Sequence, residues 1–167
     1  MPAGDAPAIT IGNVRFRDIG PLVAIQRASF RPGLAYSRGA LYTLWLLPAV
    51  TFLVARDPGG EAIGCIIGDR HLGGVRIMNL AVHPRWRRRG VATALLRAIA
   101  ERLPEGDIVL MVEEHNEGAQ ALYAREGFVR TGFSHDYYGR GRHGIQMTLH
   151  RDPPPRRGRP VPRRIIT

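Results

Sequence analysis

The chain has 167 residues, which is long enough for one domain with its own hydrophobic core. Its formal net charge is +10 and all 24 basic residues are arginines, so acidic partners are attracted, although charge alone does not say which ones. A lone cysteine, Cys65, excludes a disulfide framework or a thiolate metal site within one chain. The start MPAGDAPA lacks a secretory-signal pattern and no apolar run has the ~20 residues of a membrane helix, so we expect a cytoplasmic protein that does not bind membranes.

Strand and helix patterns alternate along residues 9–150, and this region is predicted to be a single domain. Gly20-Pro21 opens the first predicted helix, because proline suits the first helical position, and Pro104 stops the longest one. Two apolar runs around the turn DPGG predict a β-hairpin within residues 51–70. In chain order we expect a strand at 9–16, a helix from 20, a short helix at 41–47, the hairpin, a strand at 75–83, a helix at 91–103, a strand at 107–114, a short helix at 118–126, and strands at 128–133 and 144–149.

This order of elements predicts a mixed α/β sheet with helices on its faces. Both ends of the chain differ in composition from the domain. Residues 1–8 look like a loose N-terminal leader. Residues 151–167, RDPPPRRGRPVPRRIIT, are basic and rich in proline and arginine, with few apolar residues, which predicts a flexible tail.

Four arginines stand directly before the helix expected at 91–103, in the stretch HPRWRRRG. Cations at the N-terminal end of a helix are unfavourable by about 0.3–1 kcal/mol each, unless an anion is bound there. The free N–H groups of a first helical turn bind phosphate, and Gly90 would allow a ligand to approach the backbone closely. The stretch therefore predicts an anion site, with a solvated basic loop as the alternative. A Walker loop is disfavoured because no Lys-Ser/Thr follows the glycine.

Two motifs resemble those of the GNAT superfamily of N-acetyltransferases. Arg87-x-x-Gly90-x-Ala92 is similar to its acetyl-CoA pyrophosphate loop, and the stretch at 110–128 matches a second family pattern. The matching positions in that stretch are Leu110, Val112, Asn116, Ala119, Leu122, Tyr123, Gly127 and Phe128. The resemblance implies a mostly antiparallel central sheet of six to seven strands, about four flanking helices, acetyl-CoA as the donor, and no metal.

The chain is most similar, within that superfamily, to protein N-terminal acetyltransferases of the ribosomal-protein-alanine type. The stretches IQRASF (25–30), PGLAYS (32–37) and HDYYGRGRHGIQM (135–147) carry this resemblance. His143-Gly144 departs from it, since these relatives usually have an acidic residue and alanine there. The resemblance implies that the acceptor is a protein or peptide N-terminus, contacted by residues of these stretches. They are Phe30, Tyr36, Tyr137, Tyr138 and His143.

The resemblance also implies roles on the donor side. Backbone groups of the strand at 79–82 would hold the pantetheine arm, and the N–H of Leu80 or Val82 would polarise the acetyl carbonyl. Asn116 would make a polar contact to the donor, and Tyr123 would be the general acid that protonates the leaving thiolate. The full set of expected donor-binding residues is Leu80, Ala81, Val82, Arg87, Arg88, Arg89, Gly90, Val91, Ala92, Thr93 and Asn116.

A general base is harder to assign. Met111 stands where these relatives have Glu or His, and Arg76 stands at the other position that the superfamily uses; neither accepts a proton. Glu113 shares a strand face with Met111 and is a candidate base, and His135 and His143 are the others. At pH 7 an α-amine costs about 1 kcal/mol to deprotonate, against about 4.6 kcal/mol for a lysine. A site without a strong base therefore favours an α-amine.

Three other functions stay open. The acceptor could be a small-molecule amine, such as a polyamine or an aminoglycoside. Arg157-Gly158-Arg159-Pro160 resembles an AT-hook core, which would make this a DNA-associated protein. The same fold could also bind CoA as a sensor without catalysis. We expect a monomer or a homodimer.

Overall fold

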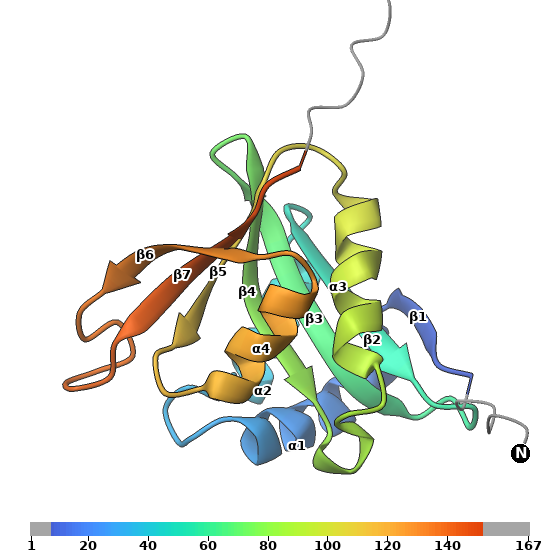
Figure 1. Ribbon diagram of the computed structural model, residues 1–167. Coiled ribbons are helices and arrows are strands. Elements are labelled where there is room, and N and C mark those ends of the chain that lie inside the picture. The colour runs from blue at the N-terminus through green and yellow to red at the C-terminus, as the bar shows by residue number, and fades with distance from the viewer. Residues whose placement is uncertain (1–7, 152–167) are drawn as a thin grey trace, which may run out of the picture.

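Seven strands form one sheet in the order β1-β2-β3-β4-β5-β7-β6 in the computed structural model, which describes residues 8–151 (Figure 1). Neighbouring strands are antiparallel except β4 and β5, which are parallel. The strands are β1 (Thr10–Asn13), β2 (Val50–Arg56), β3 (Ala62–His71), β4 (Gly74–Val82), β5 (Ile108–Glu113), β6 (Val129–Ser134) and β7 (Gly144–Leu149). The helices are α1 (Ile19–Ser29), α2 (Arg38–Leu46), α3 (Val91–Arg102) and α4 (Glu117–Arg125), with 3-10 turns at Phe16–Asp18 and Pro84–Trp86. The expected fold class is confirmed.

The helices divide between the two faces of the sheet. α3 and α4 cover one face, where Leu95 and Ile99 are fully buried. α1 and α2 cover the other face, with Ile19 and Leu41 fully buried (Figure 1). Each such burial stabilises the fold by about 1.5–3 kcal/mol relative to an exposed side chain. None of the described helices is long and apolar enough to span a bilayer.

The two expected terminal segments fall almost wholly outside the described residues. Residues 1–7 and 152–167 are not described, and the expected DNA-binding stretch 157–160 lies among them. Arg151, the first residue of the expected tail, is described and lies against the end of α3. Its guanidinium donates to the backbone carbonyls of Ala100, Leu103, Glu105 and Gly106.

The parallel strands β4 and β5 pair over only a short stretch. Paired residues run from Val75 opposite Ile108 to Ile77 opposite Leu110, although both strands continue beyond this point. A β-bulge in β4 shifts its register with β3 directly after Ile77, and bulges bend a strand. The two strands therefore part toward their C-terminal ends, and Figure 1 shows α4 over the opening.

Candidate functional site

Where β4 leaves β5, its backbone loses a strand partner on one side. His83 N–H donates to the carbonyl of Ile63 in β3 at 2.8 Å. Since alternate residues face opposite neighbours, Ala81 also bonds to β3, whereas Leu80 and Val82 face the opening. In the described part of the chain, the N–H groups of Leu80 and Val82 have no partner. Of the three residues expected to hold a pantetheine arm, these two offer free groups to an extended ligand.

A loop of exposed arginines connects the end of β4 to the start of α3. None of its four arginines, at positions 85 and 87–89, has a carboxylate partner among residues 8–151. Gly90 has a φ of +79° and nothing lies within 4 Å of where its Cβ would be, so the backbone here is open to a ligand. No side chain caps α3, and the first-turn N–H groups of residues 91–93 are unpaired in the described structure. This arrangement suits an anion that bears several oxygens.

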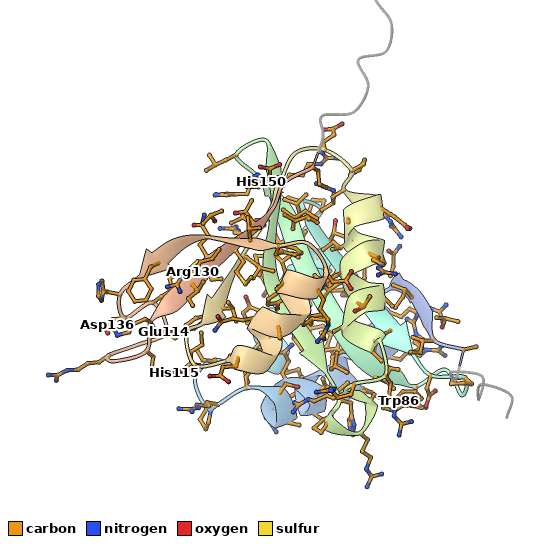
Figure 2. The ribbon with its side chains drawn as sticks, in the orientation of Figure 1. Trp86, Glu114, His115, Arg130, Asp136 and His150 are labelled. Atoms are coloured by element: carbon orange, nitrogen blue, oxygen red, sulfur yellow. The ribbon has the colours of Figure 1, made fainter. Side chains whose placement is uncertain are left out.

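Two of these arginines are already positioned by neighbours. Arg87 Nε donates to the Val82 carbonyl at 3.3 Å, and the Ser29 hydroxyl donates to the same carbonyl at 3.3 Å. The Arg89 guanidinium lies over the ring of Trp86, 5.4 Å from its centre. Figure 2 places Trp86 at the end of the molecule opposite His150. The arginine loop is thus joined to both β4 and the end of α1.

The two expected residues of the second motif both belong to α4. Asn116 is the N-cap of the helix, and its Oδ1 accepts the Ala119 N–H at 3.1 Å. Tyr123 is 8% exposed and its ring packs against Phe128 at 5.7 Å. Burial raises the pKa of the Tyr123 phenol to about 12. The phenol therefore keeps its proton at neutral pH and can act only as a donor.

Glu113, a candidate base, is engaged in an ion pair. Arg142 Nε donates to Oε1 at 2.8 Å and Arg142 Nη2 donates to Oε2 at 2.7 Å. These bonds with Arg142 hold the pKa of the Glu113 carboxyl below its ordinary value. Both oxygens are occupied and their basicity is reduced, which is unfavourable for a proton acceptor. The pair instead connects the end of β5 to the hairpin between β6 and β7.

That hairpin brings two tyrosines to the opening. Tyr138 is half-buried, and its partial burial raises the pKa of its phenol; it lies close enough to Tyr123 and Glu113 for their charges to interact. The Tyr137 ring packs edge-on against Tyr138 at 4.8 Å. Tyr137 in turn lies near the phenol of Tyr36, from the loop between α1 and α2. Three expected acceptor residues from two distant segments thus lie close together.

The other expected acceptor residues are placed differently. His143 packs against His135 at 5.1 Å and Phe133 at 5.4 Å, and its Nδ1 accepts the N–H of Asp136 at 3.1 Å. Figure 2 shows Asp136 far out along the hairpin. Phe30 ends α1 and packs against the core beneath that helix.

The two positions where the superfamily has a base are occupied by Arg76 and Met111, which cannot accept a proton. Arg76 is bonded twice to Asp69, at 3.1 and 2.6 Å. A Cβ on Gly144 would lie 2.6 Å from Met111 Cε and 2.9 Å from Tyr137 Cβ, so the methionine and the tyrosine fill the space above this glycine. In the described residues, no group of three or more His, Cys, Asp or Glu side chains could hold a metal ion.

Two residues that shape the site are not singled out by the sequence analysis, namely Arg142 and Ser29. Their partners, Glu113 and Val82, are 29 and 53 positions away along the chain. The sequence offered only an indirect indication of this role for Arg142. It is an arginine in the predicted hairpin, and Glu113 ends a predicted strand. Pairing it with Glu113 required the register of β5 with β7.

Comparisons with known proteins point to one family. Residues 48–130 match the family described as Acetyltransferase (GNAT) domain. N-alpha-acetyltransferase MAK3 of Arabidopsis thaliana is 33% identical over 116 residues, which are 65% of this chain and 60% of that protein. Mycothiol acetyltransferase of Frankia casuarinae is 42% identical over 79 residues, which are 44% of this chain and 23% of that protein. The chain therefore spans less than two thirds of either relative.

The fold is also found among solved structures. Arabidopsis thaliana NAA60 in complex with acetyl-CoA superposes with a TM-score of 0.72 and 21% identity, covering 86% of this chain and 98% of that one. At this identity the similarity establishes the fold alone.

Proposed function

This chain belongs to the GNAT acetyltransferase family, and we propose that it transfers the acetyl group of acetyl-CoA to the α-amine of a protein or peptide N-terminus. One observation carries the proposal: the free edge of β4 at Leu80 and Val82 leads directly into the exposed arginine loop. A ligand with an extended amide arm and an anionic pyrophosphate matches both features in that order. The named activity of MAK3 and the acetyl-CoA of the NAA60 structure belong to those proteins and support the proposal by analogy.

The described residues offer groups that match each part of the donor. The unpaired N–H groups at the start of α3 and the arginines of the loop would bind the pyrophosphate. Gly90 leaves room for that contact. The free groups of Leu80 and Val82 would bond to the amides of the pantetheine arm. Asn116 would act mainly by capping α4, since its Oδ1 is used within the helix.

Acetyl-CoA supplies an activated acetyl group as a thioester. The chain's own part is to hold donor and amine together, which avoids the entropy cost of their encounter. An N–H of the free β4 edge would donate to the acetyl oxygen as negative charge develops on it. The neutral amine would attack the carbonyl carbon, and the C–S bond would break as the Tyr123 hydroxyl gives its proton to the departing sulfur. The proton lost by the new amide nitrogen would restore the Tyr123 phenol, whose raised pKa favours the protonated form.

The proposed acceptor follows from the lack of a free base. Met111 and Arg76 cannot accept a proton, and Glu113 is held by Arg142. An α-amine needs little help, since about 1 kcal/mol suffices to deprotonate it at pH 7, whereas a lysine needs about 4.6 kcal/mol. The tyrosines 36, 137 and 138 would border the path of the peptide, because they flank the opening from both sides.

A small-molecule amine is the second candidate acceptor. It is favoured by the 42% identity to mycothiol acetyltransferase over 79 residues. That match is confined to 23% of the relative, so it is stronger support for a shared domain than for a shared type of acceptor.

Release of free CoA separates the two candidates. Wild-type protein with acetyl-CoA is given a panel of peptides with free N-termini, the same peptides with blocked N-termini, and a panel of polyamines and aminoglycosides. We expect release only with free N-termini. Release with the small amines alone would establish the second candidate instead.

A further inference from the structure

A buried pair of amide side chains lies between the two halves of the site. Gln26 on α1 is 0% exposed and Asn79 on β4 is 8% exposed. Gln26 Nε2 donates to Asn79 Oδ1 at 2.7 Å, and Asn79 Nδ2 donates to Gln26 Oε1 at 3.2 Å. Buried amides are costly unless they are paired, and here each pairs with the other. Such a pair also fixes the relative position of the segments that carry it.

One partner of the pair, Asn79, lies where β4, the strand that would hold acetyl-CoA, bends away from β5. Asn79 follows the bulge of β4 and is two residues beyond Ile77, the last residue that pairs with β5. Its backbone bonds to β3 and its side chain points to α1. This orientation decides that the next residue, Leu80, turns its backbone groups toward the opening.

The other partner reaches the acceptor side. Gln26 Oε1 also accepts the backbone N–H of Tyr36, at 3.4 Å. Tyr36 belongs to the loop between α1 and α2, and its phenol lies near Tyr137 of the hairpin. A single glutamine side chain therefore contacts the strand that would hold the donor and the loop that would border the acceptor.

We infer that Gln26 and Asn79 are positioning residues that couple the donor strand to the acceptor loop, so that the acetyl group and the amine meet in a fixed geometry. This assignment rests on the proposed function for its effect on catalysis, although the mechanical coupling does not. Gln26 lies within the stretch IQRASF quoted above, but neither residue is among the expected catalytic, donor-binding or acceptor-binding residues. A merely structural pair would be replaceable by any side chains that fill the same space.

Leucine substitutions at Gln26 and Asn79, singly and together, distinguish a positioning role from a purely structural one. Gln26→Leu alone leaves Asn79 unpaired, so Tm should fall by about 5 °C or more. The double variant Gln26→Leu/Asn79→Leu removes both amides, so neither is left buried without the other, and its Tm should recover most of that loss. Its kcat/KM for the acceptor peptide should stay lower by about tenfold or more, because a small misplacement of reacting groups is costly. Its Kd for CoA should change by less than about threefold, since the arginine loop is intact.

A control variant removes another polar pair, in which Thr148 is buried and Thr131 is exposed. Thr148→Val breaks the 2.8 Å hydroxyl contact with Thr131, between β6 and β7 and away from the opening. It should lower Tm and leave kcat/KM unchanged. Hydrogen exchange provides a readout that does not need turnover. In the stable double variant, residues 30–37 and 78–82 should gain exchange together, whereas in Thr148→Val neither segment should.

The outcomes are distinct. Wild-type kcat/KM in the double variant, or unchanged exchange at 30–37, would overturn the coupling. If wild-type protein acetylates no amine, the proposed function fails. Joint exchange of the two segments in the double variant would support the coupling even then.

Discussion

Glu113 and Arg142 form a bidentate ion pair that joins the last residue of β5 to the hairpin between β6 and β7, with donor–acceptor distances of 2.8 and 2.7 Å. Arg142 also bonds to the backbone of Tyr138, whose N–H donates to the Arg142 carbonyl at 3.0 Å. The pair therefore sets the position of a tyrosine that borders the opening. This role differs from that of a general base, and the two roles predict different kinetics.

Glu113→Gln should weaken acceptor binding and leave the pH dependence of catalysis unchanged. The amide keeps the size of the side chain but loses the charge that holds Arg142, so KM for the acceptor peptide should rise by about tenfold. The acidic limb of the kcat/KM profile should stay at the same pH, because it reports the amine. Glu114→Gln is the control, since Glu114 has no ion pair among the described residues. Loss of the acidic limb in Glu113→Gln would restore Glu113 as the base.

The same pair should contribute to stability in a defined pH range. Arg142 lowers the pKa of Glu113 in the folded state, so the contribution is present above the ordinary glutamate pKa and is lost as pH falls through the lowered value. The pair is partly exposed, so the difference in free energy of unfolding between wild type and Glu113→Gln should be about 0.5–1 kcal/mol at pH 7. Urea unfolding at a series of pH values measures it. If the difference in free energy of unfolding between wild type and Glu113→Gln grew below pH ~4, the ion pair would not be the source of the stabilisation.

Tyr123→Phe should lower kcat without weakening the donor. The phenylalanine keeps the packing against Phe128 and removes only the proton donor, so kcat should fall by about 100-fold or more. CoA affinity, measured by calorimetry, should be unchanged. Since burial raises the Tyr123 pKa to about 12, no loss of wild-type kcat below pH ~10 should come from its ionisation. Full activity in the variant would show that another group protonates the thiolate.

Substitution of the loop arginines should act on the anionic part of the donor alone. Arg88→Ala/Arg89→Ala should raise KM for acetyl-CoA by about tenfold or more, and the effect should shrink with added salt because these side chains are exposed. KM for S-acetylpantetheine, which lacks the pyrophosphate, should not change. Arg102→Ala at the other end of α3 is the matched control. Equal losses with both donors would contradict an anion site in this loop.

Arg151→Ala should destabilise the protein without affecting the reaction. Its guanidinium donates to four carbonyls around the end of α3, far from the opening. Loss of these bonds should lower the free energy of unfolding by about 1–3 kcal/mol, and Arg151→Lys should recover only part, since an ammonium cannot match the planar guanidinium. Denaturant unfolding tests the loss of stability, and kcat/KM measured at 15 °C tests whether the reaction is unaffected. An unchanged midpoint would show that the contact is not formed in solution.

Local patterns in the sequence predicted most of the fold. The helical pattern at 91–103 and the stop at Pro104 predicted α3 almost to the residue, because a helix depends on contacts only a few positions apart. The arginines and Gly90 predicted an anion site for the same reason. The sequence did not single out Gln26, which lies within the quoted stretch IQRASF, or Asn79. Their pairing across 53 positions depends on the bulge in β4 and on where α1 crosses the sheet, and no local pattern encodes these.

The central claim is that the acceptor is an α-amine, and one peptide can test it directly. A peptide with both a free N-terminus and an internal lysine is incubated with acetyl-CoA and protein, and mass spectrometry locates the acetyl group; Tyr123→Phe serves as the low-activity control. We expect acetylation at the N-terminal amine at a rate well above that at the lysine, with both rates reduced in the variant. Equal or faster acetylation of the lysine would contradict it.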